Sequence, residues 1–162
     1  MSTIDKNQAV IDFLLNCPQI RDNPLFFNAI NAKDNNKEII TVSNEKTAQT
    51  PFIDGGIAKQ FTFTIIDFRS VSYQAIVKQT GYVHENVEEM LDVQGIIDWV
   101  MEQDKAHIYP DFGSDCIIDS MTPTTDNPSL NSIDNSASPA LAKYSMSIKI
   151  EYIDNTNKIG HE

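Results

Sequence analysis

The segment from Gln60 to Lys105 constrains the fold most strongly, because it contains two different hydrophobic periods in succession. Residues 60–68, QFTFTIIDF, alternate between two faces, which is the period of a β-strand rich in aromatic and β-branched residues. Residues 85–105 instead repeat apolar side chains every three or four positions, as on one face of an α-helix: Val87, Met90, Val93, Ile97 and Val100. We therefore predict a sheet crossed by a long helix, with most of the core between them.

The same patterns predict further elements on both sides of this segment. An N-terminal helix, capped by Ser2 or Thr3, is expected to end near Pro18, and a second helical segment is expected to begin at Pro24. Strands are expected at 37–43, 106–112, 114–121 and 142–154, with 70–77 either extending the central strand or forming another.

The length of 162 residues and this order of elements predict a single α+β domain over residues 1–154. Its sheet is expected to be mixed or antiparallel, with four to five strands and with helices packed on one face. Gly95 inside the long helix indicates a close approach of the helix to the sheet, because glycine otherwise weakens a helix. Residues 155–162 are expected to form a frayed tail.

Two polar segments, 44–56 and 122–140, are expected to be long loops. The first closes with Asp-Gly-Gly and resembles the tip of a hairpin that returns through the central strand. A small sheet with unpaired edges and two such arms favours self-association; the alternative is two surface loops without that role. The candidate contact residues are Phe52, Ile53, Asp54, Thr122, Asp126, Leu130, Ile133 and Pro139.

The formal net charge of −11 argues against a protein that grips nucleic acid electrostatically and disfavours an anionic membrane surface. It suits a protein that stays monomeric until a partner drives assembly. The N-terminus lacks a basic signal region, and no apolar run approaches the ~20 residues of a membrane span. Cys17 and Cys116 belong to no CxxC pair and are interpreted as buried thiols of a reduced cytoplasm.

Sequence motifs do not predict a catalytic, metal or cofactor site. His84-Glu85 matches half of an HExxH zinc motif, but Glu88 replaces the second histidine. Residues 111–113 spell Asp-Phe-Gly without the other kinase signatures. Trp99 is interpreted as a packed residue, with an exposed contact residue as the alternative. The solvated face of the long helix is expected to carry Asp92, Asp98 and Glu102.

Three stretches carry a resemblance to a known family. KQFTFTIIDFRSVSYQ leads into ENVEEMLDVQGIIDWVMEQDK, and a Pro/Ser/Asn-rich segment leads into KYSMSIKIEYID. In element order and strand texture, residues 8–154 resemble the small tail terminator, or tail-completion, proteins of long-tailed bacteriophages, including those described as minor capsid proteins. The length of 122–140 departs from that pattern.

The resemblance implies a virion structural protein, assembled in the host cytoplasm, without catalytic residues or cofactors. Such proteins form a hexameric ring at the head-proximal end of the tail tube, stop its polymerisation and meet the head-side connector or stopper. DNA would pass through the acidic lumen without specific binding. The alternatives are another neck or tail component (a stopper, tail tube or baseplate protein) and a small bacterial enzyme or ligand-binding domain.

Overall fold

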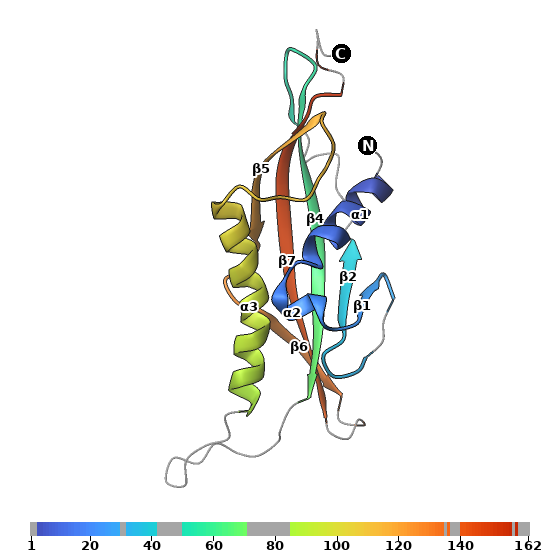
Figure 1. The fold of residues 1–162 in the computed structure, drawn as a ribbon, viewed down its shortest axis with the longest axis vertical. Helices are drawn as coiled ribbons and strands as arrows, with labels where there is room; N and C mark the ends of the chain where they lie inside the picture. Colours follow the sequence, from blue (N-terminus) through green and yellow to red (C-terminus); the bar gives the residue numbers. More distant parts are fainter. Residues whose placement is uncertain are drawn as a thin grey trace.

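The computed structural model of the chain describes residues 3–29, 32–41, 50–70, 85–134, 136, 140–156 and 158. The described helices are α1 (Thr3–Leu14), α2 (Pro18–Arg21) and α3 (Glu85–Lys105). The described strands are β1 (Leu25–Phe27), β2 (Lys37–Thr41), β3 (Thr50–Pro51), β4 (Ile57–Ser70), β5 (Cys116–Pro123), β6 (Ser129–Asp134) and β7 (Leu141–Asp154). Within this part of the chain, three helices and one seven-stranded, mostly antiparallel sheet confirm the predicted α+β class (Figure 1).

Strands β4 and β7 form the spine of the sheet. They pair antiparallel along all fourteen residues of each strand, from Ile57 opposite Asp154 to Ser70 opposite Leu141. β2 lies on the other side of β4, and β1 pairs parallel with β2. β5 pairs with the half of β7 near Asp154, and β6 pairs with the half near Leu141. The spine is therefore about 45 Å long, at the usual rise of a β-strand.

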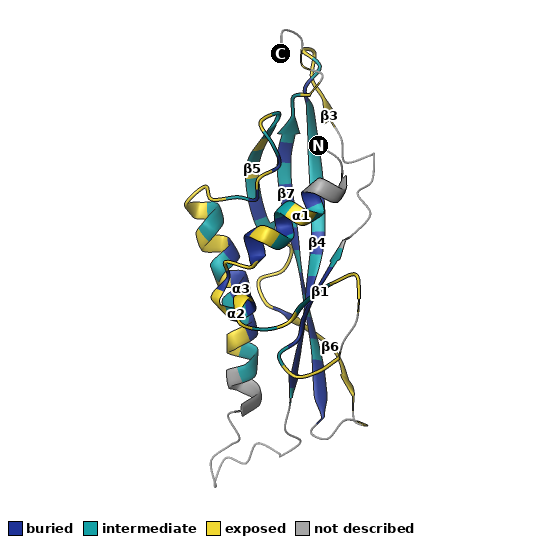
Figure 2. Cartoon of the chain, turned by 45° about the vertical axis from the view of Figure 1, so that its right-hand side comes forward, coloured by how far each residue is buried: buried dark blue, intermediate teal, exposed yellow. Residues whose placement is uncertain are grey.

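The helices pack on one face of the sheet, and the main core lies between them and the two spine strands (Figure 2). This cluster includes Phe61, Phe63 and Ile65 of β4, Tyr144, Met146, Ile148, Ile150 and Tyr152 of β7, Val93, Ile96, Ile97 and Val100 of α3, and Val10, Phe13 and Leu14 of α1. Both predicted periodicities are thus confirmed, except that the side chain of Val87 lies outside the described residues.

The opposite face of the sheet also buries a few apolar side chains. Ile66, Phe68 and Leu141 form a second, smaller cluster there, with Ile40 packed against it. These positions alternate with the core residues of the same strands, as a period of two requires. The face away from the helices is therefore apolar around Ile66 and Phe68, whereas it carries mainly polar and charged side chains elsewhere.

Three described strands lie where the sequence patterns predict none, which explains why the sheet exceeds four to five strands. The prediction of a helical segment from Pro24 is wrong, because this part of the chain forms the extended strand β1 and pairs with β2. Asn28 and Asn35, between these strands, have positive φ angles of 48° and 65°, a conformation that asparagine tolerates better than most residues. β3 and β6 lie inside the segments 44–56 and 122–140, so neither segment is a loop throughout.

Other predicted boundaries also change. The strand expected at 106–112 is wrong, because Pro110 offers no backbone donor to a sheet and Phe112 is instead buried against Phe61, with ring centroids 5.7 Å apart. The strand expected at 114–121 begins and ends two residues later. Pro18 is the first residue of α2. The expected strand continuation at 71–77 lies outside the described residues.

Helix α3 ends in a Schellman-type turn centred on His107. The N–H of Ile108 donates to the carbonyl of Gln103 at 2.9 Å, and the N–H of His107 donates to that of Asp104 at 3.0 Å. His107 has a φ of 56°, which is the left-handed conformation that such a cap requires. The Asp104 carboxylate then accepts the N–H of Met121 at 2.9 Å, so the end of the helix is tied to β5.

We expect His107→Gly to raise the free energy of unfolding by about 1 kcal/mol, because glycine adopts a left-handed conformation without the cost that a Cβ imposes. Lys105→Gly, two residues earlier and inside the helix, is the matched control and should lower it by about 1 kcal/mol. Urea denaturation measures both changes. An unchanged or lower midpoint for His107→Gly would contradict strain at this cap.

Gly95 allows a close contact between two helices. A Cβ at this position would collide with the side-chain amide of Gln19 in α2. The close approach expected from the sequence is therefore present, but its partner is α2 and not the sheet. The same Gln19 side chain accepts a hydrogen bond from the Cys17 thiol at 3.3 Å, which fills the junction between α1, α2 and α3.

Cys17 is fully buried in this junction, as predicted, whereas Cys116 is only half-buried. Burial raises the pKa of the Cys17 thiol from about 9 to about 11. Between these values the unfolded chain loses the thiol proton and the folded chain keeps it, so stability must fall as pH rises through this window.

We expect the parent protein to lose about 2 kcal/mol more stability than Cys17→Ala between pH 8 and pH 11, because two pKa units correspond to that order of free energy. Urea denaturation of both proteins at a series of pH values tests this. Below pH 8 the free energies of unfolding of the two proteins should differ by a constant amount, which is the packing energy lost in the variant. Parallel curves up to pH 11 would rule out the buried thiol as the cause.

A buried cluster of charged side chains fixes α3 to the sheet. Asp67 of β4 lies 2.9 Å from the Lys37 ammonium and accepts two hydrogen bonds from the Arg69 guanidinium, both at 2.9 Å. The same guanidinium reaches Glu89 at 3.1 Å and Asp92 at 2.6 Å, both on α3. Burial lowers the pKa of Lys37, and the side chains of Lys37 and Asp67 have no exposed surface.

Candidate interaction surfaces

The first candidate surface is the turn between β3 and β4, here called the hairpin tip and defined by residues 52–56. The N–H of Phe52 donates to the carbonyl of Gly56 at 2.7 Å, and the N–H of Gly56 donates to the Asp54 carboxylate at 3.0 Å. The tip is thus closed by its own hydrogen bonds, yet Ile53 is fully exposed and Phe52 is 45% exposed. A pre-formed turn loses little conformational entropy on binding, which favours a contact role.

The second candidate surface is strand β6, here called the β6 edge. All six of its residues are exposed, one edge pairs with β7, and its other edge pairs with no strand in the described part of the chain. Leu130 and Ile133 are 52% and 40% exposed. An unpaired strand edge offers backbone donors and acceptors to another strand, and natural proteins usually cover such an edge.

A register shift in β6 places its two apolar side chains on one face. Residues three apart in a regular strand point to opposite faces. The irregularity between Leu130 and Ser132 changes this, since Leu130 lies opposite Tyr144 and Ile133 lies opposite Ala142. Tyr144 and Ala142 share one face of β7, so their two partners share it as well. An irregularity of this kind re-aims side chains, and here it places Leu130 and Ile133 on the same face of the β6 edge.

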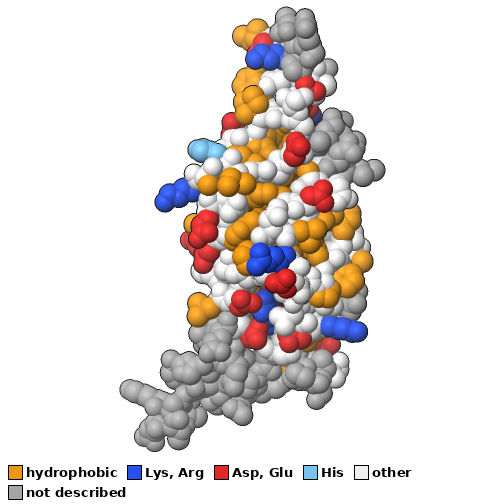
Figure 3. All heavy atoms as spheres, in the orientation of Figure 1, with side chains coloured by type: hydrophobic (Ala, Val, Ile, Leu, Met, Phe, Trp, Pro, Cys, Tyr) orange, Lys and Arg blue, Asp and Glu red, His pale blue; other side chains and the backbone are white. Residues whose placement is uncertain are grey.

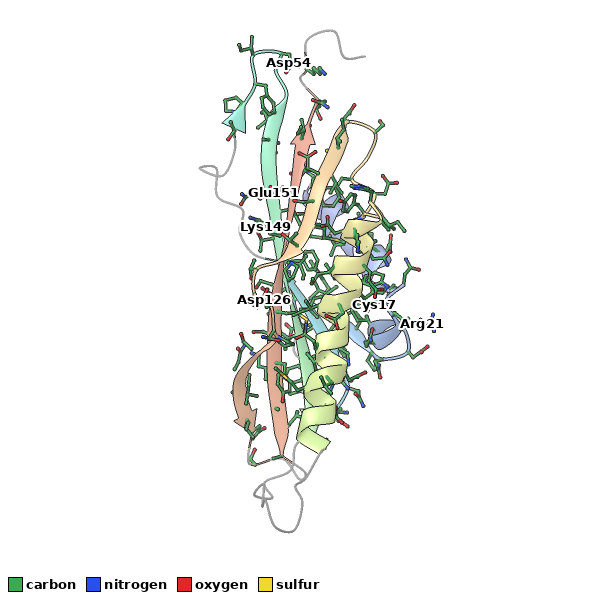
Figure 4. All side chains as sticks on the ribbon, turned by 90° about the vertical axis from the view of Figure 1, so that its left-hand side faces the viewer. Cys17, Arg21, Asp54, Asp126, Lys149 and Glu151 are labelled. Carbon is green, nitrogen blue, oxygen red and sulfur yellow. The ribbon has the colours of Figure 1, made fainter. Side chains whose placement is uncertain are left out.

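The sheet face opposite the helices is polar along the middle of the spine (Figure 4). The Thr64 and Ser147 hydroxyls are 2.8 Å apart and hydrogen-bonded, and Lys149 forms an ion pair with Glu151 at 2.9 Å. Thr122 of β5 pairs with Lys149 and is half-buried. These polar groups therefore satisfy one another within the chain.

A groove of about 560 Å³ lies on the helical side, between α1 and the segment that follows α3. Its apolar lining comes from Ala9, Phe13, Ile108, Tyr109 and Pro110. The charged side chains that line it, Asp12 and Asp111, are both acidic, and Ile108 is mostly exposed. Figure 3 shows that apolar side chains gather on this side of the molecule. We call this feature the α1 groove; sequence reasoning missed it because its two walls are far apart in the chain.

The predicted contact residues do not form one patch. Phe52, Ile53 and Asp54 lie beyond Ile57, at the end of the spine where β7 finishes, whereas Leu130 and Ile133 pair near the start of β7. The two groups therefore lie near opposite ends of the spine (Figure 1).

The other predicted contact residues lie elsewhere. Asp126 is exposed in the connection between β5 and β6, and its carbonyl accepts a hydrogen bond from Gln94 of α3 at 3.1 Å. Thr122 is on β5. Pro139 lies outside the described residues.

Several residues that resemble parts of catalytic or binding motifs have structural contacts instead. Asp111 accepts the N–H of Gly113 at 2.9 Å within its own turn. Trp99 is half-buried and packs against Phe13 with ring centroids 5.0 Å apart, as predicted for a packed residue. Asp92 keeps half of its side chain exposed, as expected for the solvated face of the helix, and also forms an ion pair with Arg69. His84 lies outside the described residues, and the described residues contain no group of three or more His, Cys, Asp and Glu positioned to hold a metal ion.

No protein-family model matches the chain, and no curated protein matches its sequence. Among the described helices, none combines the length and the apolar character needed to cross a membrane.

Proposed function

We propose that this chain is a structural protein that assembles with copies of itself into a ring, as tail terminators of long-tailed bacteriophages do. The observation that supports this most is the β6 edge. It is exposed along its whole length, its outer edge is unpaired in the described part of the chain, and a bulge aligns Leu130 and Ile133 on one face. A second copy could pair with this backbone and cover both apolar side chains.

Two separated apolar surfaces are compatible with ring assembly. A ring repeats a contact between two different patches until rotation closes it. This chain carries exposed apolar groups at the hairpin tip and at the β6 edge, near opposite ends of the spine. A head-to-tail contact repeated around a ring could use both of these surfaces.

The net charge of the chain is compatible with DNA passing through such a ring. A net charge of −11 disfavours tight binding to phosphate groups, so DNA could pass through a ring of these subunits without being held. The expected protein neighbours are the tail tube on one side and a head-side connector or stopper on the other. In this proposal the chain acts by shape and strand pairing, without a cofactor or a catalytic step.

We expect Leu130→Ser combined with Ile133→Ser to leave the fold intact and to abolish or strongly weaken assembly, because both side chains are exposed in the single chain. Analytical ultracentrifugation and negative-stain imaging, with and without tail tubes, measure the assembly. The matched control combines Leu91→Ser with Met101→Ser, two exposed apolar residues of α3. If the β6 variant assembles as the parent does, the β6 edge is not the contact.

The form of the assembly separates the terminator from related components. A tail tube protein should polymerise alone into long filaments, whereas a terminator should stop at a ring or wait for a tube end. A monomer that is indifferent to tubes at high concentration would contradict the proposal and would turn attention to the α1 groove as a ligand site.

A further inference from the structure

Glu38 of β2 is a buried acid that lacks a complete set of partners. Its side chain is 2% exposed, and its Oε2 atom accepts no hydrogen bond within the described part of the chain. A buried acceptor without a hydrogen bond keeps the cost of leaving water, and this cost is larger for a charged group. Glu38 therefore differs from Asp67, whose buried carboxylate binds two cations.

The sheet places Glu38 among apolar side chains on the face opposite the helices. Residues that pair across neighbouring strands share a face, and Glu38 pairs with Phe26 of β1 on one side and with Ile66 of β4 on the other. Ile66 belongs to the second apolar cluster, and Ile40, two residues after Glu38, packs against that cluster. Both lateral neighbours of the carboxyl group are thus apolar.

One charged side chain in the described part of the chain faces the same side as Glu38 and acts on it. Lys37, Asp67 and Arg69, the charged residues nearest to it on β2 and β4, belong to the buried cluster on the helical face, and β1 contains no charged residue. Burial raises the pKa of Glu38, and the ammonium group of Lys143 on β7 offsets only part of this shift.

We propose that Glu38 is a proton-controlled switch in the β1–β2 edge of the sheet. With the carboxyl group protonated, the side chain is neutral and β2 stays paired with both β1 and β4. When the carboxyl group ionises, its uncompensated charge favours local opening that admits water. β1 is the element that is most easily displaced, because it has three residues and pairs only with β2 in the described part of the chain (Figure 1).

The switch has a defined direction with pH. The folded chain holds the Glu38 proton more tightly than the unfolded chain, since burial raises the pKa. The stability that this residue allows is therefore highest in acid, and it falls as pH rises through the ordinary glutamate range and beyond. The inference does not depend on the proposed ring assembly.

Glu38→Gln tests the switch, because it removes the charge and keeps the shape of the side chain. At pH 7.5 we expect its folding equilibrium constant to exceed that of the parent by about tenfold, since an unsatisfied buried charge is lost. The difference should shrink as the pH falls to 4, where the parent is protonated as well. Urea denaturation at a series of pH values measures it. The ion pairs that both proteins share weaken equally in acid and cancel in the comparison.

Two further variants control for packing and for surface charge. Glu102→Gln removes an exposed carboxylate from α3 and should follow the parent at every pH. Glu38→Met removes both polar atoms, so it serves if a buried glutamine amide is itself poorly accommodated. For both Glu38 variants the decisive quantity is the change with pH in their difference from the parent.

Hydrogen exchange shows whether the effect is local to this edge. At pH 7.5, backbone amides of β1 and β2 should exchange about tenfold more slowly in Glu38→Gln than in the parent, and at pH 4 equally fast. Amides of β5, on the other side of β7, should change much less. A parent-to-variant difference that is constant with pH for both Glu38 variants would show a hydrated carboxyl group and overturn the switch. Unchanged exchange in β1 and β2 would overturn the opening of this edge.

Discussion

Asp67→Asn should lower the free energy of unfolding by about 3–5 kcal/mol, which is among the largest effects that we expect from a single substitution in this chain. The Asp67 carboxylate neutralises two buried cations, Lys37 and Arg69, through three contacts of 2.9 Å. Asparagine has a similar shape but supplies no negative charge, so both cations would keep their desolvation cost without this compensation. Chemical denaturation at neutral pH measures the loss directly.

Two controls define the cause of this effect. Asp98→Asn removes a carboxylate from the exposed face of α3 and should change stability by less than about 0.5 kcal/mol. Replacing the central three residues together, with Lys37→Met, Asp67→Leu and Arg69→Met, removes the buried charges as a set and should cost much less than Asp67→Asn alone. A small effect of Asp67→Asn, comparable with Asp98→Asn, would show that the cluster is hydrated in solution.

Phe63→Ala should cost a similar amount, about 3–5 kcal/mol, because it deletes a fully buried aromatic side chain at the centre of the spine. Phe63 pairs with Ile148, and both belong to the core beneath the helices. The cavity left behind is surrounded by rigid strands that cannot collapse into it.

The neighbouring residue is the natural control for this substitution. Thr64 points to the opposite face and is half-buried, and its hydroxyl shares one hydrogen bond with Ser147. Thr64→Ala should cost about 1 kcal/mol, the usual net value of one such bond. Equal losses for Phe63→Ala and Thr64→Ala in urea denaturation would contradict the assignment of the two faces.

Only the elements with a strong local signal can be predicted from the sequence of this chain. The alternation in β4 and β7 and the helical period of α3 are visible in the sequence because each burial pattern extends over many residues. The hairpin tip was also visible, since Asp-Gly-Gly provides the conformations of a tight turn. In contrast, β1 has three residues and β3 has two, which is too short for any period to be read.

The candidate surfaces show the same division. The exposed apolar residues Ile53, Leu130 and Ile133 could be picked out as isolated hydrophobic positions in polar segments. The sequence did not show that Leu130 and Ile133 share a face, because their spacing of three is wrong for a regular strand and depends on the bulge against β7. Nor did it show the α1 groove, whose walls are about 100 residues apart along the chain.

The sequence by itself determined that this chain has two long amphipathic strands and one long helix around a single main core, because periodic burial is encoded locally. Tertiary structure alone decided three other features. Lys37, Asp67 and Arg69 became partners because β2 lies beside β4, and residues 129–134 became a strand because β7 offers its edge. The α1 groove formed because the irregular segment after α3 returns beside α1. Each of these depends on contacts between distant residues, which local patterns do not specify.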